Sequence, residues 1–500
     1  MRKSWLACAV LLLGGCVSLP RHVHKTPSEA LRRPDTTALS GIVARVAGGG
    51  NLSGVRLLSS GDEALASLIT LADRAERTLD IQYYIIHQDD SARLLLHHVR
   101  LAADRGVRVR VLVDDLNTAG EDRRFMHLSE HAHVEVRVFN PFPGGRSALW
   151  TRFLASVSEI PRINHRMHNK LFVADNAIAI TGGRNIGDQY FTRDPHSNFI
   201  DLDVVAAGPI VPRLSASFDA FWNSKYAYPI ASVASAVEAE AVPAALEESA
   251  AAGDANWLAH QLDADDLQLT WVPATVLADR PGKMGRDAVV GTEATFANSI
   301  KTLMRSAQQE VIVISPYFVP GPDGVELLRH LVGRGVHIRV LTNSLASTDS
   351  PLVHNGYSRY RIALLKLGVE LAEVRPKLGQ KRKRFHPFKS SNASLHAKAL
   401  VIDQRTVFIG SMNMDARSAR TNSELGLVLA SPEIAQQVTS LLDDVSADGS
   451  YKLELDPSER IVWTSGEPGS EEVWYSDPET TRMQRFLLKL LAPFAPEELL

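Results

Sequence analysis

Two sets of residues with matching types and spacing are the part of this chain best suited to chemistry. Both sets follow the pattern H-x-K-x4-D-x6-G-[GS]-x-N without a gap. Their members are His168, Lys170, Asp175, Gly183 and Asn185 in the first set, and His396, Lys398, Asp403, Ser411 and Asn413 in the second. Because the whole pattern occurs twice, we interpret these residues as functional rather than merely structural.

The spacing within each motif predicts a site for an anion. Residues two apart on a strand share a face, so each histidine projects beside its lysine. If the two motifs meet, they supply two imidazoles, two ammonium groups and two side-chain amides, which suits phosphate. One imidazole can attack phosphorus while the other protonates the leaving oxygen, and the lysines offset the charge on phosphate. This chemistry needs no metal ion and no other cofactor.

Further residues around the motifs have predicted supporting roles. Asp201 and Glu424 occupy equivalent places in the two copies, where a carboxylate can hold a histidine in the right tautomer. The alternative is that both lie at solvated strand ends. The small residues Gly183 and Ser411 would let the backbone approach a ligand closely. The amides of the two motif asparagines can donate hydrogen bonds to it.

An internal repeat surrounds the two motifs. Residues 79–86 and 105–115 resemble residues 311–319 and 334–344. The offset falls from 234 between Tyr83 and Tyr317 to 228 between the two histidines, which small differences in loop length explain. Apolar alternation over 107–113 and 336–341 predicts buried strands, and apolar spacing over 62–77 and 91–105 predicts crossover helices. The sequence therefore predicts an α/β protein made of two similar halves.

The amino terminus has the layout of a signal peptide. A basic pair precedes an apolar stretch over residues 5–13, which is too short to span a bilayer permanently. The run Leu13-Gly14-Gly15-Cys16 resembles a bacterial lipobox, so we expect Cys16 to be lipidated and to begin the mature chain. An unlipidated cleaved signal and an uncleaved anchor are the alternatives. The expected location is the bacterial cell envelope, on a lipid anchor and facing the periplasm.

Composition excludes several classes of protein. The chain has 500 residues, of which 45% are hydrophobic and 22% charged, as in ordinary globular proteins. Its two cysteines cannot build a disulfide scaffold or a multi-thiolate metal site. A net charge of −3 argues against a surface that wraps nucleic acid, so no nucleic acid partner is expected.

Composition also suggests how the chain is divided. The expected segments are a signal peptide over 1–15, a tether over 16–54, a first half over 55–230, a linker over 231–262, a second half over 263–445 and a C-terminal tail over 446–500. The tether and the linker lack sustained periodicity. In the tail, Trp474, Phe486, Leu487 and Leu490 predict a packed terminal helix.

The paired motifs resemble those of the phospholipase D superfamily, with both of its HKD motifs intact. The similarity extends over about residues 57–442. Beyond the motifs, several stretches resemble bacterial cardiolipin synthases, especially the type C branch: 79–90, 107–118, 139–142, 166–176, 182–191 and 354–361. The resemblance implies two similar α/β/α sandwich halves with the active site at their interface.

The resemblance also implies a reaction. One of His168 and His396 would form a phosphohistidine intermediate, and the other would act as acid and then as base. The motif lysines and asparagines would bind phosphate, while Asp175 and Asp403 are more often structural in this family. The expected reaction is phosphatidyl transfer, in which phosphatidylglycerol accepts a phosphatidyl group from a second phospholipid to give cardiolipin.

Other reactions fit the same residues. A hydrolytic phospholipase D would let water take the intermediate and release phosphatidic acid. A nuclease of the superfamily and a lipid-binding module without activity are less favoured. The sequence does not identify a partner protein.

A membrane surface is the expected partner besides the phospholipid substrates. Basic and aromatic residues mix over 377–389, as on surfaces that bind anionic lipid, although a solvated loop is the alternative. Trp150 and Phe153 are either an apolar contact of the same kind or part of the core.

Overall fold

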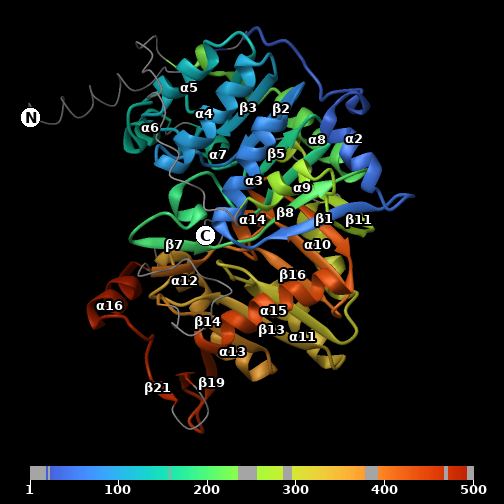
Figure 1. Ribbon diagram of the computed structural model, residues 1–500. Coiled ribbons are helices and arrows are strands. Elements are labelled where there is room, and N and C mark those ends of the chain that lie inside the picture. Colours follow the sequence, from blue (N-terminus) through green and yellow to red (C-terminus); the bar gives the residue numbers. More distant parts are fainter. Residues whose placement is uncertain are drawn as a thin grey trace, which may run out of the picture.

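The computed structural model describes residues 19–20, 23–156, 159–234, 256–284, 295–377, 392–466 and 471–491. Two large mixed sheets form the body of the protein, and helices cover them (Figure 1). In Figure 1 the first half, coloured blue to green, lies above the second half, coloured yellow to red. The predicted α/β class is confirmed.

The first sheet has the strand order β10-β1-β8-β6-β5-β2-β3-β4-β9. Strands β2, β3 and β4 are parallel to one another, and their neighbours run antiparallel to them. The strands are β1 (Ser53–Leu58), β2 (Thr78–Tyr83), β3 (Arg108–Asp114), β4 (Val134–Phe139), β5 (Leu171–Ala174), β6 (Ile178–Gly182), β8 (Asp203–Ala207), β9 (Ala227–Pro229) and β10 (Thr270–Val272).

Helices cover both faces of the first sheet. The outer face packs against α2, α3, α4 and α5, and the inner face packs against α8. Gly106, just after α4, has φ +93°, a left-handed conformation that ends the helix. The helices are α2 (Ala38–Val46), α3 (Gly61–Arg74), α4 (Asp90–Asp104), α5 (Asp122–Ser129), α6 (Leu149–Ala155), α7 (Ile160–Ile163), α8 (Ile210–Trp222) and α9 (Trp257–Asp263).

The second sheet repeats this plan with the order β11-β18-β17-β16-β12-β13-β14-β19-β20-β21. Its strands are β11 (Ala274–Ala278), β12 (Glu310–Ile314), β13 (His337–Asn343), β14 (Glu370–Val374), β16 (Ala399–Ile402), β17 (Thr406–Gly410), β18 (Leu425–Ala430), β19 (Ser450–Leu455), β20 (Ile461–Ser465) and β21 (Glu472–Trp474).

Helices also cover the second sheet on both faces. The outer face packs against α10, α11, α12 and α13, and the inner face packs against α15. The helices of this half are α10 (Phe296–Arg305), α11 (Gly321–Gly333), α12 (Pro351–Ser358), α13 (Arg361–Leu367), α14 (Ala416–Arg420), α15 (Pro432–Asp448) and α16 (Arg482–Leu491). Each half is therefore an α/β/α sandwich, as expected.

The two halves share one hydrophobic core. That core contains inward-facing residues of both sheets together with the buried faces of α8 and α15. A short parallel pair of strands, β7 (Ser197–Ile200) and β15 (Asn392–Leu395), also links the halves. This pairing fixes the register between the segments that lead into the two motifs.

The structure corrects the predicted register at the start of the repeat. Thr78 begins β2 and Glu310 begins β12, which gives an offset of 232, so Tyr83 corresponds to Ser315 and not to Tyr317. The sequence comparison matched two aromatic residues, whereas strand pairing is set by backbone position. The later offset of 228 between the histidines agrees with the pairing of β5 with β6 and of β16 with β17.

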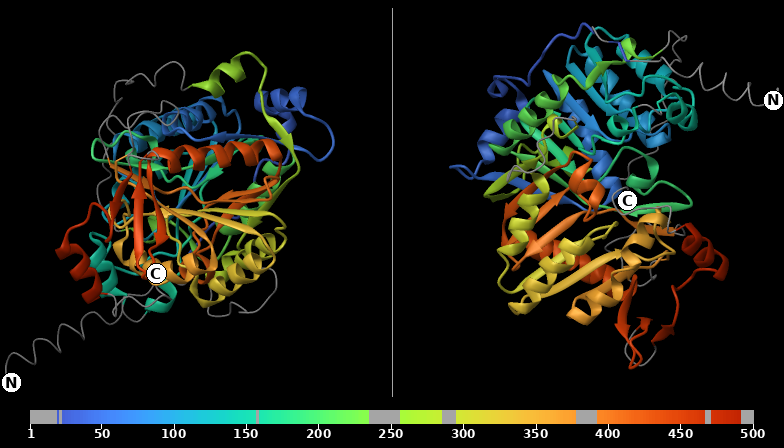
Figure 2. Two further views of the ribbon diagram at one scale, coloured as in Figure 1. Left: turned by 90° about the horizontal axis from the view of Figure 1, so that it is seen from below. Right: turned by 180° about the vertical axis from the view of Figure 1, so that it is seen from behind.

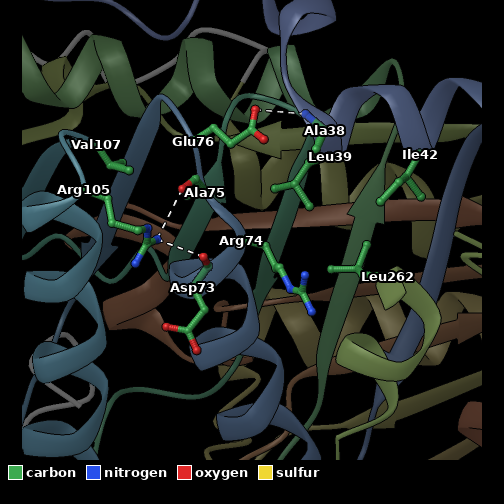
Figure 3. A pocket seen from close by; sticks show the side chains of 10 residues that line it. All are labelled: Ala38, Leu39, Ile42, Asp73, Arg74, Ala75, Glu76, Arg105, Val107 and Leu262. Carbon is green, nitrogen blue, oxygen red and sulfur yellow. Dashed lines mark hydrogen bonds between the residues drawn. The ribbon is translucent and has the colours of Figure 1, made fainter. Parts of the chain in front are cut away.

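Several segments differ from the predicted division of the chain. Within the predicted tether, α2 packs on the first half: Ala38 N donates to Glu76 Oε2 at 3.1 Å, and Leu39 and Ile42 lie over a cavity of about 400 Å³ next to Leu262 (Figure 3). Strand β10 lies in the range predicted for the second half but joins the first sheet. Strands β19–β21 lie in the predicted tail and extend the second sheet.

The prediction of a packed terminal helix is wrong. Helix α16 exists, but its apolar side chains face solvent, with Phe486 61% and Leu490 58% exposed. Trp150 is 68% exposed and Phe153 is also exposed, which excludes the core alternative for both. The signal peptide with Cys16, most of the linker and residues 378–389 of the basic segment lie outside the described residues.

Candidate active site

Backbone pairing between the halves brings the two motifs together. His168 N donates to Ser423 O at 3.0 Å, and Ser423 N donates to Arg166 O at 2.9 Å. In the other copy, His396 N donates to Ile200 O at 2.8 Å. Each histidine is thus hydrogen-bonded to the residue that directly precedes the carboxylate of the opposite half, so that carboxylate must lie beside the imidazole.

The carboxylates are exchanged between the halves. Glu424 Oε2 lies 3.0 Å from His168 Nδ1, and Asp201 Oδ2 lies 2.5 Å from His396 Nδ1. While its carboxylate is ionised, each ring donates from Nδ1 and keeps the lone pair of Nε2 for chemistry, because an ionised carboxylate only accepts. Both carboxylates are buried, so the alternative of solvated strand ends is wrong.

The ammonium group of each motif lysine is hydrogen-bonded to the backbone of the histidine of the same motif. Lys170 Nζ donates to His168 O at 2.6 Å, and Lys398 Nζ donates to His396 O. Burial lowers the pKa of Lys398 to about 8. Burial and the positive charge of Lys398 lower the pKa of Lys170 as well. Such a buried pair of ammonium groups favours an anionic ligand, because the ligand would offset their mutual repulsion.

Gly183 and Ser411 both lie against the carboxylate of their own half. A Cβ atom on Gly183 would lie 2.1 Å from Asp201 Oδ1, so only glycine leaves room for this aspartate. The Ser411 hydroxyl donates to Glu424 Oε2 and accepts from Leu425 N at 3.0 Å. For these two residues, which we predicted to contact substrate, the contacts instead support a role in positioning the carboxylates.

The carboxylates of the two halves differ in charge state. The hydrogen bond from His396, and the charge of that ring when it is protonated, hold the pKa of Asp201 down at about 2, despite burial. Burial raises the pKa of Glu424 to about 7. The two imidazoles therefore face acceptors of different basicity, although the backbone around them is related by the repeat.

The two motif asparagines also differ in their partners. Asn185 Oδ1 accepts from Ile85 N at 3.2 Å, and its Nδ2 donates to the Tyr190 hydroxyl at 3.0 Å. Asn413 is held through its backbone N, which donates to Ser418 Oγ at 3.2 Å, while its side-chain Oδ1 has no partner among the described residues. Asn413 therefore has an acceptor atom left for a ligand group that donates a hydrogen bond, such as a hydroxyl.

The motif aspartates lie at the opposite ends of the strands from the histidines. Asp175 accepts from the backbone N of Glu76, Arg77 and Thr78 at 2.8–2.9 Å. Asp403 accepts from the backbone N of residues 308–310 at 2.7–3.1 Å. Each aspartate therefore holds the turn that leads into β2 or β12. These contacts support the structural role that the resemblance implied.

Replacing Asp175 by alanine is expected to lower the free energy of unfolding by about 2 to 4 kcal/mol, because three backbone N–H groups lose a charged acceptor. Asp403→Ala should cost less, since Asp403 is partly exposed and water can replace it. Urea unfolding of both variants measures the difference. Equal stability losses, or a loss of turnover per folded molecule in either variant, would count against a purely structural role.

The sequence analysis did not identify the aromatic side chains that contact the two histidines. The ring of Tyr84 lies edge-on to His168 at 5.0 Å between centroids, and Tyr190 lies edge-on to His396 at 5.1 Å. Phe199 contacts His396 at 5.0 Å. Tyr84 directly follows β2, and its position at the end of a parallel strand could have indicated a residue of the active site.

The site contains no arrangement typical of a resident metal ion. Among the residues that the structure describes, no group of three or more His, Cys, Asp or Glu side chains could hold a metal ion. The two buried lysines and the two imidazoles meet here beside the two carboxylates, and the lysines suit an anionic substrate directly.

Comparisons with known proteins agree with this arrangement. The family described as "Cardiolipin synthase, PLD-like domain" matches residues 68–222 and 300–445. Cardiolipin synthase C of Escherichia coli strain K12 is 38% identical over 453 residues, covering 88% of this chain and 94% of that protein. An uncharacterized protein of Helicobacter pylori strain 26695 is 30% identical and covers 98% of both chains.

A solved structure shares the fold. The crystal structure of phosphatidylserine synthase from Haemophilus influenzae superimposes with a TM-score of 0.56 over 92% of this chain and 100% of that chain, at 14% sequence identity. At this identity the similarity concerns the fold alone.

Proposed function

The chain belongs to the phospholipase D-like family of cardiolipin synthases and is a phosphatidyltransferase of that family, and we propose that it forms cardiolipin from phosphatidylglycerol and a second phospholipid through a phosphohistidine intermediate. One observation carries the proposed mechanism. Each imidazole donates from Nδ1 to a carboxylate of the other half, so both Nε2 atoms are left for the same substrate.

The first half-reaction transfers the phosphatidyl group to the protein. Nε2 of one histidine attacks phosphorus, the bond from phosphorus to the head-group oxygen breaks, and the other histidine donates the proton that this oxygen needs. Lys170 and Lys398 offset the charge on the phosphate oxygens during the attack. The anionic phosphodiester also favours a protonated partner histidine, whose pKa burial and the neighbouring lysine lower in the free protein.

The second half-reaction regenerates the histidine. A hydroxyl of phosphatidylglycerol gives its proton to the partner histidine, its oxygen bonds to phosphorus, and the phosphorus–nitrogen bond breaks. Cardiolipin leaves and both imidazoles return to their starting states. If water enters in place of this hydroxyl, the product is phosphatidic acid, so transfer depends on which acceptor reaches the intermediate.

Product analysis tests this function. Purified protein is incubated in liposomes with phosphatidylglycerol, alone or with phosphatidylethanolamine, and the lipids are resolved by mass spectrometry. Cardiolipin with released glycerol or ethanolamine is the expected result and identifies the donor. Phosphatidic acid as the sole product would replace transfer by hydrolysis, and cleavage of DNA without lipid turnover would overturn the proposed substrate class.

The dependence of kcat/KM on pH is expected to be bell-shaped with its maximum between pH 7 and 8. Glu424, with its pKa raised to about 7, loses its charge as pH falls, and Lys398, with its pKa lowered to about 8, loses its charge as pH rises. The residual activity of Glu424→Gln should keep the alkaline limb and lose the acidic one. An unchanged acidic limb in that variant would assign it to another group.

The protein is also proposed to bind a membrane surface with one side. Trp150 of α6, Ile160 of α7, and Phe486 and Leu490 of α16 are large exposed apolar residues. Figures 1 and 2 show α6 and α16 on the same side of the molecule. Helix α16 adds Arg482 and Lys489, which suit anionic lipid.

Replacing Trp150, Phe486 and Leu490 together by serine should weaken sedimentation with phosphatidylglycerol vesicles by about tenfold or more, because three apolar contacts with lipid are lost. Leu101→Ser, which changes an exposed leucine on α4, is the matched control and should bind normally. Equal binding of the triple variant and the control would contradict a membrane role for this side.

A lipid anchor on Cys16 remains a proposal from the sequence pattern. No described helix is long and apolar enough to cross a membrane. Metabolic labelling with a fatty acid should mark the wild-type protein and leave Cys16→Ala unmarked. Equal labelling would remove the anchor, and fractionation of the labelled cells would then test the proposed periplasmic location.

A further inference from the structure

A second cavity lies beside the active site in the second half. It has a volume of about 470 Å³, within the range of roughly 300 to 1,000 Å³ that is usual for pockets that bind small molecules. It lies between α10, α11 and the segment that leads into α14. Apolar side chains line most of it, among them Ile300, Phe318, Leu327, Leu328, Met412 and Met414.

This cavity shares a chain segment with the phosphate site. Met412 and Met414, which line the cavity, flank Asn413, whose side-chain Oδ1 has no partner among the described residues. Met414 pairs with Phe318 as an isolated β-bridge, and Met412 and Met414 both line the cavity whereas Asn413 between them does not. The cavity therefore lies along the segment that carries Asn413, a residue of the proposed phosphate site.

A buried arginine occupies the equivalent place in the first half. Arg184 corresponds to Met412 by the offset of 228. Its buried guanidinium donates to Leu58 O at 2.8 Å and to Asp201 O at 2.6 Å, and it pairs with Asp203. Where the first copy has a buried arginine with its hydrogen-bond partners, the second copy has a flexible apolar side chain and a cavity. The difference argues that the apolar character of this place is a specific feature of the second half.

The lining chemistry selects an apolar chain as occupant. Asp415 is the one buried charged side chain of the lining, and its Oδ1 already accepts from Ser418 N at 2.7 Å. A polar ligand would find few partners there, whereas a hydrocarbon chain gains by burial, and methionine adapts to chains of varied shape. The remaining charged residues of the lining are Lys301, Arg420 and Asp323, of which the two basic side chains could face the head group of an anionic lipid.

We propose that this cavity binds one acyl chain of the phospholipid whose phosphate lies between His168 and His396. The inference rests on the proposed function and deepens it, because it makes the second half the part of the enzyme that selects acyl chains. The glycerol backbone would cross the segment at Asn413, with the chain on the side of Met412 and Met414. Turnover should then depend on chain length.

The test fills the cavity without touching the phosphate site. Ala297 lines the cavity from α10, and Ala297→Phe should lower kcat/KM for phosphatidylglycerol with long chains by about tenfold, while leaving that for the dihexanoyl lipid nearly unchanged. Ala75→Phe is the matched control, since Ala75 lines the separate cavity under α2. It should leave the ratio of the two kcat/KM values as in the wild type.

Binding of cis-parinaric acid, a fluorescent fatty acid, gives a readout that does not need turnover. The wild type and Ala75→Phe should bind it, and Ala297→Phe and Ala419→Leu should bind at least about tenfold more weakly. Equal binding by all four proteins, or a parallel loss of turnover with long and short chains, would overturn the proposal. Wild-type protein that binds the probe but turns over no phospholipid would refute the proposed function and leave the cavity assignment standing.

Discussion

Alanine in place of either His168 or His396 is expected to lower phosphatidyl transfer by about 10⁴-fold or more, because each half-reaction needs one imidazole as nucleophile and the other as acid or base. The double variant should be no slower than the slower single variant, since the pair acts as one unit. The measurement is cardiolipin formed per minute from phosphatidylglycerol in liposomes.

Two controls separate chemistry from folding in this experiment. Thermal melts should show that both variants remain folded, and His98→Ala, which removes a histidine bonded to Asp73 on the surface, should keep full activity. Activity near that of the wild type in either active-site variant would refute the mechanism with two histidines.

Asn in place of Asp201 is expected to lower kcat/KM by about 10²- to 10⁴-fold. The asparagine amide can donate to Nδ1 of His396, which would move the ring proton to Nε2 and leave the wrong tautomer for attack. Glu424→Gln should cost less near pH 7, because burial raises the pKa of Glu424 to about 7 and part of the wild type is already protonated there.

Measuring the activity of these two variants over a range of pH tests whether the two carboxylates differ in protonation. The deficit of Asp201→Asn should stay constant from pH 6 to 9, since the pKa of Asp201 is held at about 2, while that of Glu424→Gln should grow above pH 7. Asp175→Asn carries the same substitution at the far end of the same half and should leave the pH profile unchanged. Identical profiles for the Asp201 and Glu424 variants would contradict the proposed difference between the two carboxylates.

The sequence predicted which residues belong to the site more fully than which of them contact one another. The spacing from His168 to Lys170 predicted that the two side chains project together, and both lie in the segment that leads directly into β5. The repeat pointed to Asp201 and Glu424 as equivalent residues. It could not show that Asp201 serves His396, which is 195 residues away, because local periodicity carries no information on contacts between the halves. That pairing follows from the tertiary contact of β7 with β15.

The boundaries were harder to predict for a similar reason. Strands β10 and β19–β21 are short, and their place depends on which sheet edge is open to them rather than on their own residues. The apolar face of α16 predicted burial by helical spacing alone, but spacing does not say whether protein or another apolar phase covers that face. Tyr84 and Tyr190 were inside recognised stretches, yet only the fold shows that they contact the histidines.

The exchange of carboxylates has a consequence for the ancestry of the chain. When His168 of one copy meets Glu424 of the other and His396 meets Asp201, each copy gives and receives the same contact, which is the signature of an isologous two-fold interface. A symmetric homodimer of a single copy would therefore already hold a complete site. Fusion of two copies in one chain releases them from identical sequences, and the pairs Gly183–Asp201 and Ser411–Glu424 record how far the two have since diverged.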